Sequence, residues 1–301
     1  MRHLFNQFIV KIFPYLPLSF VRLVAKKYVA GENSADALNV VKALNKRGYC
    51  ATVDILGEHI NDKHTASLIT SEYQYLLCSI HEQKLNCNIS IKPSHLGMDI
   101  SSDCIIKNMT NLIETARKNH HFVRIDMEDS TLTDDTISLY NNCKKQYDHI
   151  GIVLQAYLLR SIHDLNKLQN NTELNLRICK GIYRESKNVA FQDRYEINNN
   201  FLKLLRMAFK KNIYVCIATH DLSLIKESYA IIDELGISKD HFEFQVLYGV
   251  PMSGWLERHL YKGYKVRVYV PFGEDWYDYS LRRIKENPDI ANYILKDIFR
   301  K

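Results

Sequence analysis

The sequence predicts an α/β protein folded as a closed (β/α)8 TIM-type barrel, with an N-terminal helical arm. Eight short runs rich in β-branched and apolar residues recur from residue 49 onward, and a segment with room for a helix separates each pair of runs. Strands that alternate with helices imply a parallel sheet, and eight such units favour a closed barrel. The eleven glycines form no GxG, and no GxxxxGK[ST] occurs, which disfavours the alternative of an open dinucleotide-binding sheet and also a P-loop.

The composition is that of an ordinary globular protein with a large core. Of the 301 residues, 46% are hydrophobic and 25% are charged, which excludes disordered and collagen-like chains. The net charge of +6 suits anionic ligands but is not the concentrated charge of a nucleic-acid binder. The seven cysteines form no CxxC pair, so we expect no metal site, no disulfide framework and a reducing, cytoplasmic compartment.

Residues 1–31 contain five Lys or Arg and no Asp or Glu. Apolar residues recur at helical spacing in 4–13 and 20–29, on either side of Pro14 and Pro17. Two interpretations remain: a pair of helices packed on the main domain, or a basic amphipathic surface that contacts a membrane. A third helix is predicted with Ser34 as its N-cap and Gly48 at its end. This places the arm at 1–48 and the barrel at 49–301.

The eight predicted strands are nearly continuous apolar runs, as expected for parallel strands that are buried on both faces. They lie at 49–56, 88–92, 122–127, 150–155, 174–180, 213–218, 242–247 and 265–270. Between them, segments such as 101–119 and 190–212 have helical periodicity. A last helix carries Tyr279, Arg282, Arg283 and Glu286 on one face and is predicted to end before Pro288.

Ionisable side chains gather at the strand ends, where a barrel of this type has its active site. Buried cations are costly without partners, so the four cations at the strand ends require anions. Acidic residues of the same mouth supply some of them, and a bound anionic ligand would supply the rest. The cations are Lys92, Arg177, Lys180 and His220, and the acids are Glu58, Asp126 and Glu128. The adjacent Arg282 and Arg283 either clamp a carboxylate or form a solvated basic patch; their place just after the last strand favours the clamp.

Together these motifs resemble those of the proline dehydrogenase family. The matching stretches occur in the family's order over 49–287: SIKPS at 90–94, RIDME at 124–128, VLQAY at 153–157, RICKGIY at 177–183, ATH at 218–220, FEFQ at 242–245, and YVPFG at 269–273 followed by Tyr279 and RRIKE at 282–286. The resemblance implies non-covalently bound FAD and oxidation of L-proline to 1-pyrroline-5-carboxylate, the first step of proline degradation to glutamate. Electrons would pass to a quinone, which gives the basic arm a use at the inner face of a membrane.

The resemblance also implies roles for individual residues around the substrate. Arg282 and Arg283 would clamp the proline carboxylate, with Lys92 as a third cation, and Glu58 would pair with Lys92 when substrate is absent. Asp126 would orient Tyr269 and organise the site. The walls around the proline ring would be Ile178, Tyr183, Tyr269 and Tyr279.

A second set of residues is expected to bind FAD. Gln155 would contact the polar edge of the flavin ring, and Arg177 would lie near N5, where a cation favours the reduced anionic flavin. Lys180 and the backbone of Gly181 would meet the phosphate and ribose region, and Glu286 the ribose or adenosine portion. The remaining expected contacts are Met127, Ile182, Thr219, His220 and Gln245.

Departures from the family pattern are few. Asp221 stands where Asn is often seen, and Cys179, which we interpret as a packing residue, stands where Val is common. A full tyrosine at Tyr269 favours proline over its hydroxylated derivative. Three other functions remain as alternatives: a Schiff-base aldolase using Lys92 or Lys180, a non-catalytic binding barrel, and a flavin barrel that reduces a pterin or folate.

Overall fold

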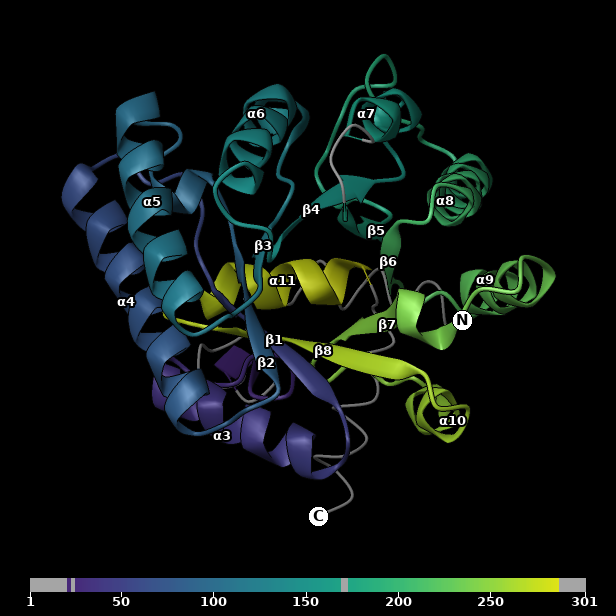
Figure 1. Ribbon diagram of the computed structural model, residues 1–301, viewed down its shortest axis with the longest axis horizontal. Helices are drawn as coiled ribbons and strands as arrows, with labels where there is room; N and C mark the ends of the chain where they lie inside the picture. Colours follow the sequence, from purple (N-terminus) through teal and green to yellow (C-terminus); the bar gives the residue numbers. More distant parts are fainter. Residues whose placement is uncertain (1–20, 23–24, 169–172, 287–301) are drawn as a thin grey trace.

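Eight parallel strands close into one barrel in the computed structural model, which describes residues 21–22, 25–168 and 173–286 (Figure 1). The strands follow one another around the sheet in chain order, and β8 pairs with β1 from Cys50 opposite Arg267 to Ile55 opposite Phe272. The predicted fold class is therefore confirmed. The strands are β1 Cys50–Ile55, β2 Cys87–Ile91, β3 Val123–Ile125, β4 Ile150–Gln155, β5 Asn175–Cys179, β6 Tyr214–Ala218, β7 Phe242–Leu247 and β8 Lys265–Phe272.

The strand boundaries follow the predictions to within two residues at either end. β4 and β7 coincide with the predicted ranges. β3 is shorter than predicted because the chain leaves the sheet after Ile125, although the N–H of Asp126 still donates to the carbonyl of Ile91 at 2.8 Å. β8 is longer because it pairs with β1 as far as Phe272.

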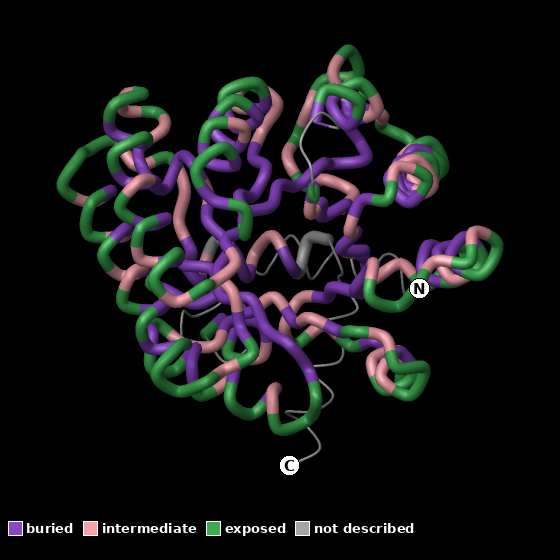
Figure 2. Tube along the Cα trace, viewed as in Figure 1, coloured by how far each residue is buried: buried purple, intermediate pink, exposed green. Residues whose placement is uncertain are grey.

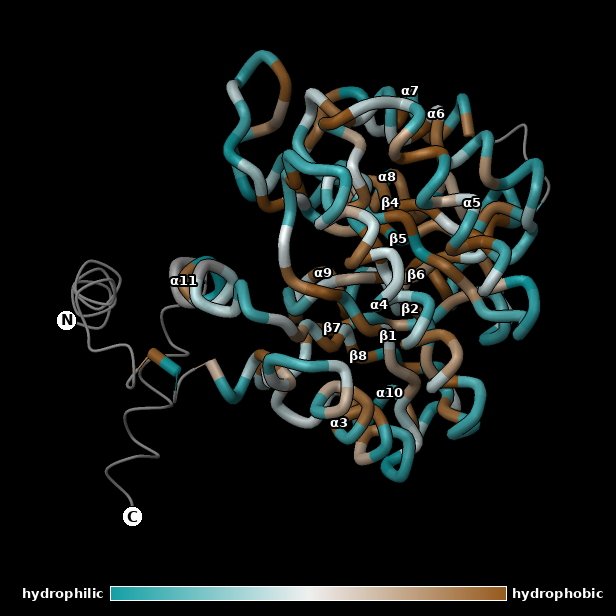
Figure 3. The backbone as a smooth tube through the Cα atoms, turned by 90° about the vertical axis from the view of Figure 1, so that its left-hand side faces the viewer, coloured by the Kyte–Doolittle hydropathy of each residue, from teal (hydrophilic) through white to brown (hydrophobic). Residues whose placement is uncertain are grey.

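Helices surround the barrel and turn their apolar sides toward the strands, so that burial decreases outward (Figures 1 and 2). They are α3 Ser34–Lys46, α4 Lys63–Glu82, α5 Ser102–Lys118, α6 Thr133–Lys144, α7 Ser161–Leu168, α8 Arg194–Lys210, α9 Leu222–Glu234 and α10 Trp255–Tyr261. Short 3-10 turns, η2 Ser94–Leu96, η3 Ser130–Leu132 and η4 Lys239–His241, complete the connections. A side view shows hydrophobic colour concentrated in the strands (Figure 3).

The predicted N-cap of α3 is wrong by one residue. The cap is Asn33, whose side-chain oxygen accepts the N–H of Asp36 at 3.0 Å. Ser34 begins the helix, and its hydroxyl donates to Glu72 at 2.8 Å. The apolar face of α3 belongs to the same hydrophobic core as the barrel strands. The predicted boundary at residue 48, between the N-terminal arm and the barrel, therefore stays a prediction.

The described part of the N-terminal segment packs on the barrel. Val21, Ala25, Tyr28 and Val29 are buried. The N–H of Ala30 donates to the carbonyl of Pro271 at 2.9 Å, and the backbone of Lys27 approaches Gly249 so closely that a Cβ there would lie 1.6 Å from the Lys27 oxygen. For these residues the packed interpretation of the arm is supported. Residues 1–20, which carry most of the predicted amphipathic surface, lie outside the described residues.

The strands present two chemically different faces. Residues such as Val53, Ile125 and Val246 belong to the apolar core between the strands and the helices, and they alternate with residues that point into the barrel. Most of the side chains that point into the barrel carry charge or hydrogen-bonding groups, and nearly all of these are buried. They include Asp54, Ser90, Arg124, Asp126, Gln155, Arg177, Glu243, Gln245, Arg267 and Tyr269. The interior is therefore a polar column inside an apolar ring.

Helix α11, Trp276–Glu286, lies across one end of this column, as Figures 1 and 3 show from two directions. Arg282 on this helix reaches Glu58 in the loop after β1, so α11 lies over the carboxyl ends of the strands. In the part of the chain that the structure describes, no helix has the length and hydropathy needed to cross a bilayer.

Candidate active site

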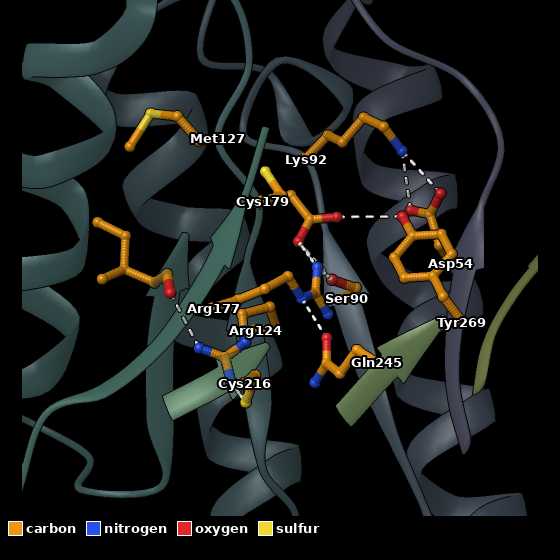
Figure 4. A network of polar contacts seen from close by, with 12 residues as sticks. Asp54, Ser90, Lys92, Arg124, Met127, Arg177, Cys179, Cys216, Gln245 and Tyr269 are labelled. Atoms are coloured by element: carbon orange, nitrogen blue, oxygen red, sulfur yellow. Dashed lines mark hydrogen bonds and ion pairs between the residues drawn. The ribbon is translucent and has the colours of Figure 1, made fainter. Parts of the chain in front are cut away.

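A buried cluster at the carboxyl end of the barrel is centred on Asp126. Figure 4 shows its hydrogen-bond partners Ser90, Arg177 and Tyr269. One carboxylate oxygen accepts from Nη1 of Arg177 at 2.6 Å and from the hydroxyl of Ser90 at 2.6 Å. The other accepts the hydroxyl of Tyr269 at 3.0 Å, as predicted. Burial alone lowers the pKa of Arg177, but the Asp126 carboxylate raises it overall, so the guanidinium stays charged.

Lys92 points into the same cluster but pairs with Asp54 (Figure 4). Its ammonium donates to both carboxylate oxygens, at 2.7 and 2.9 Å. Burial lowers the pKa of Lys92, but the carboxylates of Asp54 and Asp126 raise it overall. The predicted pairing of Lys92 with Glu58 is therefore wrong. Glu58 lies on the loop beyond β1, whereas Asp54 lies inside the strand, beside β2.

Glu58 instead joins an outer cluster beneath α11. It accepts the hydroxyl of Tyr183 at 3.1 Å and Nη1 of Arg282 at 3.3 Å. Arg282 is 40% exposed, whereas Arg283 is buried and its guanidinium lies over the ring of Tyr279 at 5.1 Å. Burial raises the pKa of Tyr183, so its phenol is a neutral donor.

Glu128 connects the loops after β2 and β3. Its carboxyl oxygens accept the N–H of Ser94 at 2.9 Å and, through a very short contact, the Ser94 hydroxyl. Burial raises the pKa of Glu128 to about 7, against the lowering effect of these hydrogen bonds. Glu128 thereby fixes the turn η2, which follows Lys92.

Gln155 ends β4 with an unused hydrogen-bond acceptor. Its amide nitrogen donates to the carbonyl of Met127 at 3.3 Å. Its oxygen Oε1 is buried and has no hydrogen-bond partner among the residues that the structure describes. A buried acceptor in this state is costly, and an N–H from a ligand would satisfy it.

Lys180, after β5, is held by an acid whose partner role the sequence analysis missed. Oδ2 of Asp221 accepts from Lys180 at 2.7 Å and from Arg194 at 2.8 Å. The donors around it, Lys180 first, lower the pKa of Asp221 despite the opposing effect of burial. Next to Lys180, Gly181 has φ +104°, and a Cβ there would lie 2.1 Å from the ring of Tyr157, so only glycine suits this close approach.

His220 follows β6 as a neutral imidazole. Burial, and to a lesser extent the charge of Arg283, lowers its pKa to about 4. Its Nε2 accepts the N–H of Leu247 at 2.8 Å, so the ring proton is on Nδ1, which is a donor. Thr219 contributes its hydroxyl to the turn by accepting the N–H of Asp221 at 3.1 Å.

Some expected residues lie elsewhere or are engaged differently. Ile178 is fully buried, and strand alternation places it opposite Arg177 on the helix-facing side, so the structure does not bring it to the cluster. Ile182 is half exposed on the loop after β5. Gln245 is buried, with both ends of its amide bonded to protein groups. Glu286 ends α11, but its side chain is outside the described part. Burial raises the pKa of Cys179 to about 11, which fits a packing role.

Asp54 is the site residue that the sequence analysis missed. It is an acid inside the apolar run 49–56, and its side chain is 2% exposed. An acidic residue inside a run of otherwise uncharged residues was the available signal. Asp54 lies before the end of the predicted strand, whereas the residues taken as the strand end begin at Gly57.

The whole arrangement suits a small anionic substrate. Beside it, the protein offers a larger group several hydrogen-bond donors and one hydrogen-bond acceptor. Lys92, Arg282 and Arg283 supply cations around the mouth, and tyrosines supply apolar walls with neutral hydroxyls. Arg177, Lys180, His220 and the free oxygen of Gln155 line the adjoining strand ends from β4 to β6.

Comparisons with known proteins agree on one family. The family model for proline dehydrogenase matches residues 37–294. Over 280 residues the chain is 37% identical to Proline dehydrogenase 2 of Bacillus subtilis (strain 168), covering 93% of this chain and 92% of that protein. It is 33% identical to Proline dehydrogenase of Deinococcus radiodurans, with 92% and 90% covered.

A solved structure shares the fold. The chain superimposes on proline utilization A (PutA) from Bdellovibrio bacteriovorus, inactivated by N-propargylglycine, with a TM-score of 0.82 at 23% identity. The match covers 88% of this chain and 32% of that longer protein.

Proposed function

Since this chain belongs to the proline dehydrogenase family, we propose that it oxidises L-proline to 1-pyrroline-5-carboxylate with FAD and passes the electrons to a quinone. The observation that carries the proposal is the convergence of Lys92, Asp126, Arg177 and Tyr269 in one buried cluster at the mouth, with Arg282 above it.

The cations of the mouth bind the substrate carboxylate. Lys92 has three N–H donors and uses two on Asp54, so one remains for a carboxylate oxygen. Arg282 pairs with Glu58 and is the more exposed member of the outer cluster, so it can exchange this partner for the incoming carboxylate. Arg283 completes the clamp beside Tyr279.

The residues present fit a flavin dinucleotide. The unpartnered oxygen of Gln155 suits the imide N–H of the flavin ring, and Nδ1–H of His220 and the ammonium of Lys180 suit anionic or hydroxyl oxygens. Gly181 has no side chain of its own, so its backbone can lie directly against the ring of Tyr157. We assign this backbone to the phosphate and ribose region of the cofactor from the motif match. We assign Met127, Thr219, Ile182 and Glu286 to the same site from the motif match.

When bound, FAD supplies a two-electron oxidant that accepts hydride from the ring carbon next to the proline nitrogen. Arg177 holds a fixed positive charge at the place where negative charge develops. Asp126 keeps that charge in position and also fixes the hydroxyl of Tyr269. Tyr183, Tyr269 and Tyr279 exclude water from the proline ring. The proline amine must be neutral for its lone pair to assist, and we propose water as the acceptor of its proton.

Electron delivery to a quinone gives the first part of the basic segment, residues 1–20, a role at a membrane surface, since Val21, Ala25 and Tyr28 are buried against the barrel. Ion pairing with anionic headgroups and burial of the apolar stripe at 4–13 would both contribute to binding. Sedimentation with anionic vesicles compares the full chain with a chain that starts at Val21. Equal binding of both would contradict this role.

The proposed reaction is tested by its product. We expect the protein, supplied with FAD, a soluble quinone and L-proline, to form a cyclic imine that is two hydrogens lighter than proline, with one quinone reduced per imine. D-proline is the control substrate. Absence of the imine would contradict the proposal, and a borohydride-stable lysine adduct with a carbonyl substrate would favour an aldolase. Bleaching of the flavin by NADH but not by proline would favour a pterin or folate reductase.

A further inference from the structure

Arg177 is held from two sides inside the barrel, by Asp126 on one side and by Gln245 on the other. Figure 4 shows Arg177 and Gln245. Its Nη1 donates to Asp126 at 2.6 Å and more weakly to Ser90 at 3.3 Å. Its Nε donates to the side-chain oxygen of Gln245 at 2.6 Å. Among the described residues, Nη2 donates to no acceptor, so its two N–H bonds remain for a ligand.

The amide of Gln245 has its orientation imposed by Glu243. These two residues are two positions apart on β7, so both point into the barrel, and both are buried. The nitrogen of Gln245 donates to Oε1 of Glu243 at 2.6 Å. An ionised carboxylate only accepts hydrogen bonds, and a guanidinium only donates them. If the amide of Gln245 were flipped, its oxygen would face the Glu243 carboxylate and its N–H groups would face the guanidinium of Arg177, so neither hydrogen bond could form.

Arg267 keeps Glu243 in the required ionised state. Its Nε donates to Oε1 at 2.7 Å and its Nη2 to Oε2 at 3.1 Å, the bidentate arrangement of a strong ion pair. Burial would raise the pKa of Glu243, but the Arg267 guanidinium lowers it to about 2. Arg267, Glu243, Gln245, Arg177 and Asp126 thus form a continuous chain of hydrogen bonds through the barrel interior.

We propose that Gln245 is a positioning residue for Arg177, and that Glu243, through the orientation of the Gln245 amide, directs Nη2 of Arg177 toward the oxidant. The inference rests on the proposed function, since it takes Arg177 as the cation beside the flavin. It replaces the direct contact between Gln245 and cofactor that the motif match implied, because both ends of this amide are already bonded to protein.

The test replaces Gln245 with Met, which has a similar length but cannot accept the Arg177 N–H. Because Arg177 is then less well positioned, the reduced anionic flavin should be less stable. The reduction potential of the bound flavin should therefore fall. The rate constant for flavin reduction at saturating proline should fall about tenfold or more, as expected when a charged group leaves its reactive geometry. The dissociation constant for FAD and the apparent affinity for proline should change less than this rate constant.

Two further variants make the test decisive. Gln245→Asn keeps both amide groups but withdraws the oxygen by one methylene, so it should change the potential in the same direction if the Met variant does not fold. Val246→Ala removes buried packing on the helix-facing side of the same strand, so it should lower the melting temperature but leave the potential unchanged.

If both Gln245 variants keep the reduction potential and the flavin reduction rate of the wild type, the inference is overturned and the proposed function stays intact. The same conclusion follows if the reduction potential falls equally in Val246→Ala. Wild-type protein that binds no FAD, or whose flavin proline does not reduce, would instead overturn the proposed function and this inference with it.

Discussion

Lys92 and Asp54 form an ion pair from which water is almost excluded, with side chains 13% and 2% exposed. Removing one partner of such a pair leaves an uncompensated charge in a medium of low polarity, which is far more costly than losing an exposed pair. The hydroxyl of Tyr73 adds a weaker contact to Asp54 at 3.4 Å. Asp54 therefore supports the fold as well as the position of Lys92.

Asp54→Asn should lower the free energy of unfolding by about 3–5 kcal/mol, the usual loss for a broken buried pair. The matched control is Asp134→Asn, which removes an acid from an exposed pair with Arg160 and should cost no more than about 1 kcal/mol. Urea unfolding at neutral pH measures both. Equal losses in the two variants would contradict the assigned burial of the Lys92 pair.

Arg282→Met should raise the KM for proline about tenfold, because one charge-assisted hydrogen bond to the carboxylate is lost and the site is partly solvated. The FAD content of the purified protein should stay near that of the wild type. Steady-state kinetics and flavin absorbance measure the two effects. Loss of FAD together with an unchanged KM would show that Arg282 serves the cofactor and not the substrate.

The motif match predicted part of the site's chemistry. It placed Asp126 beside Tyr269, since both lie near the ends of strands that meet at one mouth. It mispaired Lys92 because the reach of a loop residue such as Glu58 depends on how the chain turns after Ile55. It also missed the network behind Arg177, because nothing in the local pattern of 242–247 shows which side of the barrel the amide of Gln245 faces.

At the scale of elements, α8 shows how a helix start is fixed next to the site. Asp193 caps the helix by accepting the N–H groups of Tyr195 at 2.8 Å and Glu196 at 3.2 Å. The next residue, Arg194, then reaches Asp221 beside Lys180. The predicted segment 190–212 contains this helix but extends several residues before it, because helical periodicity does not mark the cap.

Asp193→Ala should lower the free energy of unfolding by about 1 kcal/mol, since two backbone N–H groups at the start of α8 lose their acceptor. Asp193→Ser keeps a capping oxygen and should recover most of the loss. Thermal unfolding monitored by far-ultraviolet circular dichroism measures both variants. An Ala variant as stable as the Ser variant would contradict the capping role.

At the scale of the whole molecule, stability depends on buried groups that titrate in weak acid. Burial lowers the pKa of His95 to about 3 and those of His220 and His259 to about 4. In the unfolded chain these histidines take up protons as the pH falls through about 6.5, whereas in the folded protein they stay neutral until about pH 4 or below. Their contribution to stability is therefore fully present above about pH 6.5 and is lost as the pH falls toward about 4. Glu128 acts in the opposite sense between about pH 4.5 and 7, and so does Asp54, whose pKa is also raised by burial. Burial lowers the pKa of His121 as well, so the buried histidines outnumber these two acids.

The free energy of unfolding should therefore fall steadily between about pH 6.5 and pH 4.5. His259→Phe should reduce this slope by about 1.4 kcal/mol per pH unit, because one fewer proton is taken up on unfolding. Tyr264→Phe, in the same aromatic cluster, is the control and should leave the slope unchanged. Urea unfolding at several pH values measures the slope; an unaltered slope in the His259 variant would contradict its burial as a neutral ring.

The fold as a whole was predictable because eight apolar runs with helical segments between them admit few arrangements other than a closed barrel. The polar column inside it was less predictable. In the sequence, Arg124 and Arg267 look like ordinary charged residues. Only the closed barrel shows that they lie inside it and are bonded to groups on other strands.

The central claim, that this mouth oxidises proline at a bound flavin, is tested most directly by anaerobic titration of the FAD-loaded protein with L-proline, followed by flavin absorbance. The account predicts that the oxidised flavin band bleaches with wild-type protein and that bleaching at saturating proline is much slower in Arg177→Met. A flavin that stays oxidised in the presence of proline, or a protein that takes up no FAD, would contradict it.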